Sequence, residues 1–178
     1  MKQLTKNLLI AFVATFFLFS CTGDPTASNP DIAEMSDAGK KAMDEASKSL
    51  CTCLNEHGDG LKEFTKEMNT IAAEIEKAED KEGEKAAISK MMGAMGKMKA
   101  FGECMDKAKP SGEAEKAIEA AMKKIIGEDA NRKARNKKTF ELLATFLDKN
   151  CASNAETFKG FISIMEKMDK IDENRKRK

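Results

Sequence analysis

The sequence contains no tryptophan, no tyrosine and only one histidine, and these absences exclude several kinds of site. Nucleophilic catalysis needs a base beside the nucleophile, and the single histidine, His57, is not accompanied by a Gly-x-Ser-x-Gly element. A haem-attachment motif would need a histidine directly after a cysteine, and none occurs. Gly93, Gly96 and Gly102 lie within a helical pattern and form no phosphate-binding loop. We therefore expect no enzymatic activity, no catalytic residue and no cofactor.

Residues that favour β-strands are also scarce. Phenylalanine is the only aromatic type and makes up 6% of the chain, whereas alanine, lysine, glutamate and methionine are abundant. Charged residues account for 34% of the chain, and the two signs alternate closely, as they do on the solvated faces of amphipathic helices. The composition therefore predicts an all-α fold.

The first 20 residues differ from the rest of the chain. Lys2 and Lys6 precede an apolar run from Leu8 to Phe19, and the small residue Ser20 follows that run. This order of positive, apolar and small residues is typical of a signal peptide. The run is shorter than the ~20 residues that a membrane-spanning helix needs. We expect residues 1–20 to be an export signal and the rest of the chain to work outside the cytoplasm.

The end of this segment, Leu18-Phe19-Ser20-Cys21, resembles the lipobox of bacterial lipoproteins. The resemblance covers the first 21 residues only, and Phe19 stands where a small residue is usual. It implies that Cys21 takes a diacylglycerol and becomes the first residue of the mature chain. Thr22 follows where an aspartate would favour retention in the inner membrane, so the resemblance implies the outer membrane of the cell envelope. The alternative is an ordinary secretory signal that a cysteine happens to follow.

Apolar residues then recur every three or four positions, which is typical of helices with one buried face. Glycine, proline and capping residues interrupt the pattern, above all at Gly58-Asp59-Gly60 and at Pro110-Ser111-Gly112, where we expect turns. Gly127 is a further plausible stop. The apolar stripes of the expected helices cover residues 35–53, 61–78, 88–105, 114–125, 140–147 and 158–171.

These stripes predict one domain, residues 31–174, built as an antiparallel bundle of five or six helices in helical hairpins. Residues 21–30 are small, polar and proline-containing, so we expect a lipidated flexible tether that does not pack. Ser153 and Glu156 fit a capping box that begins the last helix. Residues 175–178 form a basic tail that we expect to fray.

Four cysteines remain after Cys21, and an even number in an exported chain predicts disulfides. Cys51 and Cys53 lie two positions apart on a helix and therefore point roughly 200° away from each other. Each should pair with a different partner, Cys104 or Cys151, and either of the two connectivities is open. An up-and-down bundle places all four cysteines at one pole, so we expect the bundle to be stapled there.

A second hypothesis is a thiol-redox or copper-binding protein that uses Cys51, Cys53 and Cys104. Thiolates and thioethers suit Cu(I), and a Cys-x-Cys pair on a loop can exchange disulfides. The helix around Cys104 is rich in methionine, but its methionines keep the spacing of the leucines and isoleucines elsewhere. We therefore predict no metal site and expect core packing for the inward-facing set, Met91, Met95, Met98 and Met105.

The charge balance favours no nucleic-acid partner. The chain has 31 basic and 30 acidic residues, and only two lysines and no acid fall in the first 20. Residues 131–138 are strongly basic and form either a linker or a solvated first turn of a helix. They lack the aromatics that stack on bases, although they can touch anionic lipid headgroups. The leading hypothesis is a non-enzymatic lipoprotein with two partners: the membrane, through its lipid anchor, and an unknown protein.

Overall fold

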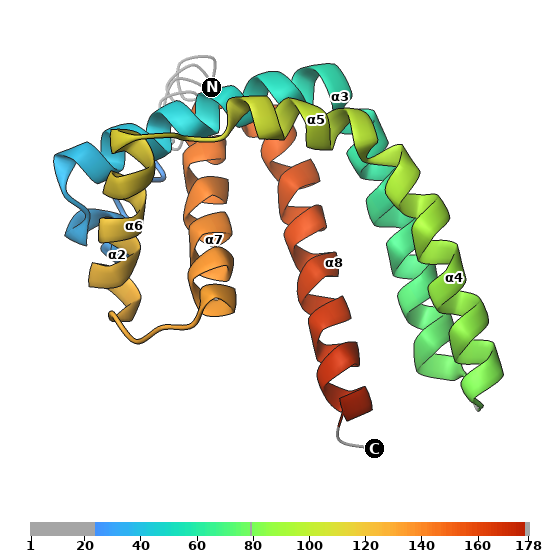
Figure 1. The fold of residues 1–178 in the computed structure, drawn as a ribbon. Helices are drawn as coiled ribbons and strands as arrows, with labels where there is room; N and C mark the ends of the chain where they lie inside the picture. Colours follow the sequence, from blue (N-terminus) through green and yellow to red (C-terminus); the bar gives the residue numbers. More distant parts are fainter. Residues whose placement is uncertain (1–23, 79, 177–178) are drawn as a thin grey trace, which may run out of the picture.

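The computed structural model describes residues 24–78 and 80–176, which form seven helices and no strand (Figure 1). The predicted all-α, disulfide-stapled bundle is confirmed. The helices are α2 (Pro30–Glu34), α3 (Asp37–Lys77), α4 (Lys81–Lys97), α5 (Lys99–Ala108), α6 (Glu113–Ile126), α7 (Arg132–Asn150) and α8 (Ala152–Lys176).

The longest helix, α3, organises the fold. Its 41 residues correspond to about 60 Å measured along the helix axis at 1.5 Å per residue, and this axis bends so that its second half turns downward beside α4 (Figure 1). Helices α4 and α5 run back along it, while α6, α7 and α8 project away from it as an antiparallel series (Figure 1). Every helix from α4 to α8 contacts α3. The predicted helical hairpins are therefore present, but they are mounted on one long helix.

The predicted turn at Gly58-Asp59-Gly60 is wrong, because α3 continues through it. A Cβ atom at Gly60 would lie 2.6 Å from the carbonyl oxygen of Lys97, the last residue of α4. Gly60 therefore allows two helices to approach closely and does not end one. The first two helices expected from the sequence are a single helix.

The methionine-rich helix also differs from the prediction. It is divided at Met98 into α4 and α5, and α4 turns Ala87 and Ala94 toward the core. Met92 and Met95 are 81% and 59% exposed, so the prediction that Met95 faces inward is wrong. The reason is the close approach of α4 to α3, which admits alanine at the contact and leaves the larger side chains on the outer side. Met91, Met98 and Met105 do pack against the core, as expected.

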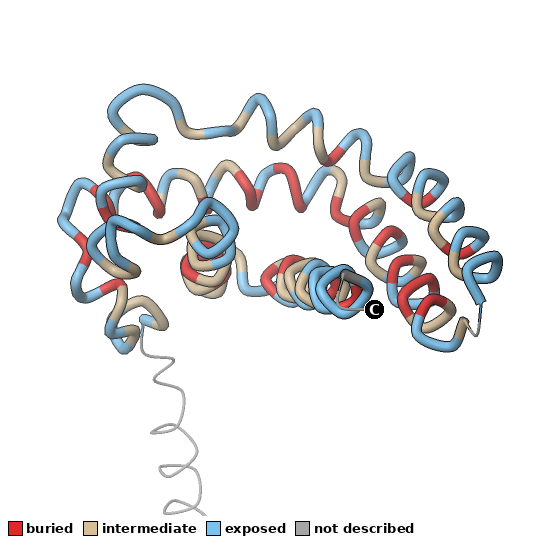
Figure 2. The backbone as a smooth tube through the Cα atoms, turned by 60° about the horizontal axis from the view of Figure 1, so that its bottom comes forward, coloured by how far each residue is buried: buried red, intermediate tan, exposed pale blue. Residues whose placement is uncertain are grey.

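The core follows one side of α3 and continues between α7 and α8 (Figure 2). Two phenylalanine pairs join these helices: Phe64 of α3 with Phe161 of α8, and Phe140 of α7 with Phe158 of α8, at ring-centroid distances of 6.2 and 6.1 Å. Within α8, Phe158 also lies 6.2 Å from Phe161. Phe158 is almost completely buried at the centre of this cluster. The apolar stripes predicted for the last two helices therefore pack against α3 and against each other.

Side-chain caps explain several helix starts. Asn29 accepts hydrogen bonds from the backbone N–H groups of Asp31 and Ile32, and Ser36 accepts one from Gly39. Asp80 and Asn131 cap α4 and α7 in the same way. Two helices therefore begin in this region. The short helix α2 follows the Asn29 cap, and α3 follows the Ser36 cap.

Both ends of the domain are more ordered than the sequence predicts. Residues 24–30 differ from the expected non-packing tether, because they form a turn, a cap and the start of α2. Helix α8 begins at Ala152, so Ser153 lies inside it and is not its cap. The same helix continues to Lys176, and Arg175 pairs with Glu84 of α4. The basic tail is therefore helical and tied to a neighbour as far as the structure describes it.

Candidate functional site

The four cysteines after Cys21 form two disulfides, Cys51–Cys151 and Cys53–Cys104, with Cα–Cα distances of 6.1 and 5.7 Å. The prediction that Cys51 and Cys53 reach different helices is confirmed. The bridges lie near the middle of α3 and not at a pole of the bundle, because α3 does not end at Gly58. One bridge joins α3 to the α7–α8 corner, and the other joins α3 to α5.

One group of possible metal ligands lies beside the second disulfide. Glu56, His57 and Cys104 bring one ligand atom each within 4.8 Å of one another. However, the Sγ atom of Cys104 is bonded to Cys53, and a disulfide sulfur is not the thiolate that binds metal. A copper or thiol-exchange role would thus require reduction of the bridges first. Among the described residues, this cluster offers only a carboxylate and an imidazole.

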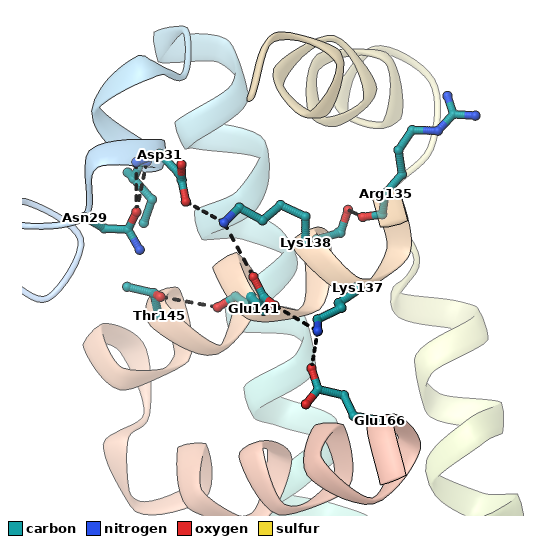
Figure 3. Close-up of polar contacts among 10 residues, drawn as sticks. Asn29, Asp31, Arg135, Lys137, Lys138, Glu141, Thr145 and Glu166 are labelled. Carbon is teal, nitrogen blue, oxygen red and sulfur yellow. Dashed lines mark hydrogen bonds and ion pairs between the residues drawn. The ribbon is translucent and has the colours of Figure 1, made fainter. Parts of the chain in front are cut away.

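The basic segment, Arg132–Lys138, forms the first two turns of α7 and is not a linker. Lys138 lies 2.6 Å from Asp31 of α2, and Lys137 lies 2.9 Å from Glu166 of α8 (Figure 3). Arg135 faces Glu119 of α6 at 3.7 Å. The segment therefore joins α7 to three neighbouring helices, where the sequence suggested a solvated face or contact with lipid headgroups.

These ion pairs raise the pKa of each lysine that takes part in them. A hydrogen bond with Asp31 is the main cause that raises the pKa of Lys138, and a hydrogen bond with Glu166 does the same for the pKa of Lys137. Lys133 lies 2.9 Å from Glu173 and 3.1 Å from Asp169 of α8, and these two hydrogen bonds raise its pKa. The three lysines are therefore held in their charged form as cross-links.

A second polar cluster lies where α7 ends. The side-chain amide of Asn150 donates to Asp44 at 3.0 Å and to the hydroxyl of Ser47, a residue with no exposed surface. Beside it, Lys149 lies 3.0 Å from Asp24. Cys151, the next residue after Asn150, bonds to Cys51. The beginning of the described chain, the first half of α3 and the end of α7 therefore meet at one place.

Asp24 is held strongly in its ionised form at this place. The side-chain hydroxyl and then the backbone N–H of Thr26 donate to its carboxylate, and Lys149 adds a third interaction. Together they lower the pKa of Asp24 from 3.8 to about 2. Asp24 lies three positions after Cys21, the candidate lipidation residue. Its ion pair with Lys149 therefore joins the chain to the domain within three residues of that cysteine.

A groove of about 440 Å³ separates α7 from α8. Its floor is apolar and consists of Phe140, Ile162 and Met165, and Met165 is 45% exposed. The ion pairs Lys133–Asp169 and Lys137–Glu166 cross the groove. Arg132 also lines it, and Lys133 pairs with Glu173 as well as with Asp169.

The lipidation candidate, Cys21, lies outside the described residues. None of the helices in residues 24–78 and 80–176 is both long and apolar enough to cross a bilayer. No protein-family model matches the chain, and searches of curated proteins and of solved structures give no significant match.

Two features of the structure are not predicted from the sequence, the attachment of Asp24 and the groove between α7 and α8. The charged residues that border the groove do show a pattern in the sequence. Cations recur at Lys133 and Lys137, and acids recur at Glu166, Asp169 and Glu173, all with helical spacing. Two antiparallel helices with such faces can pair their charges. Nothing in the sequence, however, indicates that they are neighbours at this register.

Proposed function

We propose that the protein is a non-enzymatic, membrane-anchored lipoprotein whose helical domain serves as a rigid structural or interaction module in the cell envelope. The observation that carries the proposal is the lipobox-like end of the apolar segment at Cys21, followed after three residues by an attachment of the chain to the domain at Asp24. The anchor and the folded domain are thus adjacent.

This adjacency limits how far the domain can move from the membrane. Three residues span at most about 10 Å, since an extended residue covers about 3.3–3.6 Å. A diacylglycerol with an additional acyl chain holds a protein durably, whereas a single chain gives only marginal membrane binding. The proposed lipid would therefore keep the α3–α7 junction close to the bilayer surface, with the other ends of α7 and α8 free to meet a partner.

The chemistry of the domain supports a structural role outside the cytoplasm. Disulfides persist in oxidising compartments such as the periplasm and the cell surface. The polar clusters described above join helices to one another: Lys138 to Asp31, and Asn150 to Asp44 and Ser47. Rigid cross-linking of this kind suits a module that presents a fixed surface.

Membrane fractionation tests the anchor. Wild-type protein should remain in the membrane pellet after a high-salt wash, because a lipid anchor does not depend on surface charge. Cys21→Ala should move to the soluble or unprocessed fraction. Thr22→Ala is the matched control and should stay in the pellet. A Cys21→Ala protein that remains in the washed pellet as a processed chain would contradict the proposal.

The interaction role needs a separate experiment. Crosslinking in intact cells, followed by capture of the protein, should recover a reproducible partner with the anchored chain and less of it with Cys21→Ala, because the anchor sets the location. Recovery of the same proteins in equal amounts from both chains would argue against an envelope partner that is met at the membrane.

A further inference from the structure

The disulfide between α3 and α5 has an imidazole and a carboxylate beside it. Cys53 of α3 is bonded to Cys104 of α5. Glu56 and His57 follow Cys53 by three and four positions on α3, so these side chains share one face of the helix. Glu56, His57 and Cys104 each bring a ligand atom within 4.8 Å of the other two. Four side chains with metal-binding chemistry therefore meet where α5 contacts α3.

Their donor atoms are those that zinc takes in proteins. Zn²⁺ binds thiolate sulfur at about 2.3 Å, and imidazole nitrogen and carboxylate oxygen at about 2.0–2.2 Å, in a tetrahedron whose corners lie roughly 3.3–3.8 Å apart. The Nε2 atom of His57 lies 3.7 Å from the carboxylate of Glu56. The sulfur of Cys104 lies within 4.8 Å of a ligand atom of each. Side-chain rotations are therefore enough to bring these atoms to the distances of a zinc site.

The oxidation state of the cysteines decides whether the site exists, because zinc binds the thiolate and not the disulfide. A dithiol reductant opens the bridge: it gives up two electrons and two protons and becomes a disulfide, while Cys53 and Cys104 become thiols. Cys104 is partly exposed and Cys53 only 1%, so Cys104 is the sulfur that the reductant attacks. Binding of Zn²⁺ then displaces the two thiol protons.

Apolar contacts hold the two helices together when the bridge is open. Phe101 lies three positions before Cys104 on α5 and is 4% exposed, and Met105 packs against the same core. On α3, Leu54 follows Cys53 and is also buried. The reduced Cys104 side chain therefore remains opposite Cys53, and zinc meets a site that is already assembled.

We propose that Cys53, Glu56, His57 and Cys104 bind one zinc ion when their disulfide is reduced. The ion then joins α5 to α3 in place of the covalent bond. Among the described residues, no other group of three histidine, cysteine or acidic ligands is as close together. The site uses no methionine and so differs from the copper site considered from the sequence. The inference does not depend on lipidation at Cys21, since all four ligands belong to the folded domain.

Cobalt titration tests the proposal, because Co²⁺ occupies zinc sites and absorbs visible light there. The full-length protein in neutral detergent is reduced with a phosphine, freed of the reductant without air, and titrated with cobalt chloride. We expect the absorption of tetrahedral cobalt with thiolate ligands, saturated by one ion per chain and abolished by an equal amount of zinc chloride. The oxidised protein should not show it. Absence of this absorption from the reduced protein, or equal absorption by the oxidised protein, would overturn the proposal.

The two disulfides provide a matched pair of variants. After reduction, Cys51→Ser/Cys151→Ser and Cys53→Ser/Cys104→Ser each keep one pair of thiols, but only the first keeps the proposed ligands. The first should bind cobalt as the wild type does, and the second should show no thiolate–cobalt absorption. Equal absorption by both would contradict the site.

A third variant, His57→Gln, leaves all cysteines in place. It should weaken cobalt binding by about tenfold or more, since even groups that only support a zinc ligand are worth roughly 10–100-fold in affinity. Circular dichroism checks that each variant remains helical. Unchanged affinity in a folded His57→Gln protein would remove the imidazole from the site and overturn the proposed ligand set.

Discussion

Gly60 packs against the carbonyl oxygen of Lys97, which a Cβ atom at Gly60 would approach to 2.6 Å. Gly60 is in the middle of α3, and Lys97 is the last residue of α4. The same pair of helices meets through Ala87 and Ala94, which are almost completely buried. Because Gly60 has no side chain, the end of α4 can lie close against α3 at this point.

Gly60→Ala should destabilise the protein by about 1–3 kcal/mol, the usual cost of overpacking a tight contact. Gly58→Ala is the control within the same helix, because a Cβ at that position would meet nothing within 4 Å. It should stabilise the protein by about 0.5–1 kcal/mol, since glycine is unfavourable inside a helix. Urea unfolding of both variants measures the difference. Equal effects would show that the α3–α4 contact is not tight at Gly60.

This glycine explains the largest error in the prediction of the fold. A Gly-Asp-Gly sequence after an apolar stripe is typical of a helix end, but glycine serves a helix contact equally well. The choice depends on whether another backbone comes near, and α4 starts 21 positions after Gly60. The misplacement of Met95 has the same origin. Periodicity finds the helices, whereas the distance between their axes determines which side chains fit between them.

Removal of either disulfide should reduce the free energy of unfolding substantially. The bridges close loops of 51 and 100 residues. The chain-entropy model gives about 4 kcal/mol for a loop of this size. We expect the double variant Cys53→Ala/Cys104→Ala to lose about 2–4 kcal/mol in urea unfolding while it remains helical by circular dichroism. The native protein should show no alkylatable thiol among these four cysteines by intact mass, and four free thiols would contradict the pairing.

The pairing itself was only partly predictable. Helical geometry separates Cys51 from Cys53 and so excludes a bridge between them. The choice between Cys104 and Cys151 depends on which side of α3 carries α5 and which carries the α7–α8 corner. That arrangement depends on which helices contact α3, and the spacing of the cysteines does not contain it.

Asp24 should titrate well below an ordinary aspartate. Its pKa in the folded protein is about 2, and its usual value is 3.8. Because folding lowers the pKa, Asp24 contributes to stability above about pH 3.8, and this contribution is lost as the pH falls toward 2. NMR titration of the Asp24 carboxyl should give a midpoint near 2, whereas a midpoint near 3.8 would show that the contacts of Asp24 are absent in solution.

Substitutions around Asp24 rank the causes of this shift. Thr26→Val removes the hydroxyl that is the largest cause, so it should raise the pKa of Asp24 more than Lys149→Gln does. Asp24→Asn should flatten the dependence of unfolding free energy on pH between about 4 and 2. If Lys149→Gln raised the pKa more than Thr26→Val, the ion pair and not the turn would be the dominant contact.

Only some properties of the basic segment can be predicted from the sequence. Its basic composition was readable, and the absence of interleaved aromatics argued against nucleic acid, but the sequence left open whether the segment was a linker or the first turn of a helix. Its partners were not readable, because Asp31, Glu119 and Glu166 come from three other helices. A cluster of cations on a helix therefore indicates a charged face. The neighbouring helices decide whether that face meets solvent, lipid or acidic side chains.

Lipid attachment at Cys21 is the central claim, and mass analysis of the N-terminal peptide tests it most directly. Cells are grown with a clickable fatty acid, and the wild type is compared with Cys21→Ala and Thr22→Ala. The account predicts a mature chain that begins at Cys21 and carries the label on that residue in the wild type and in Thr22→Ala, with no label in Cys21→Ala. A wild-type chain that begins at another residue, or equal labelling of wild type and Cys21→Ala, would contradict it.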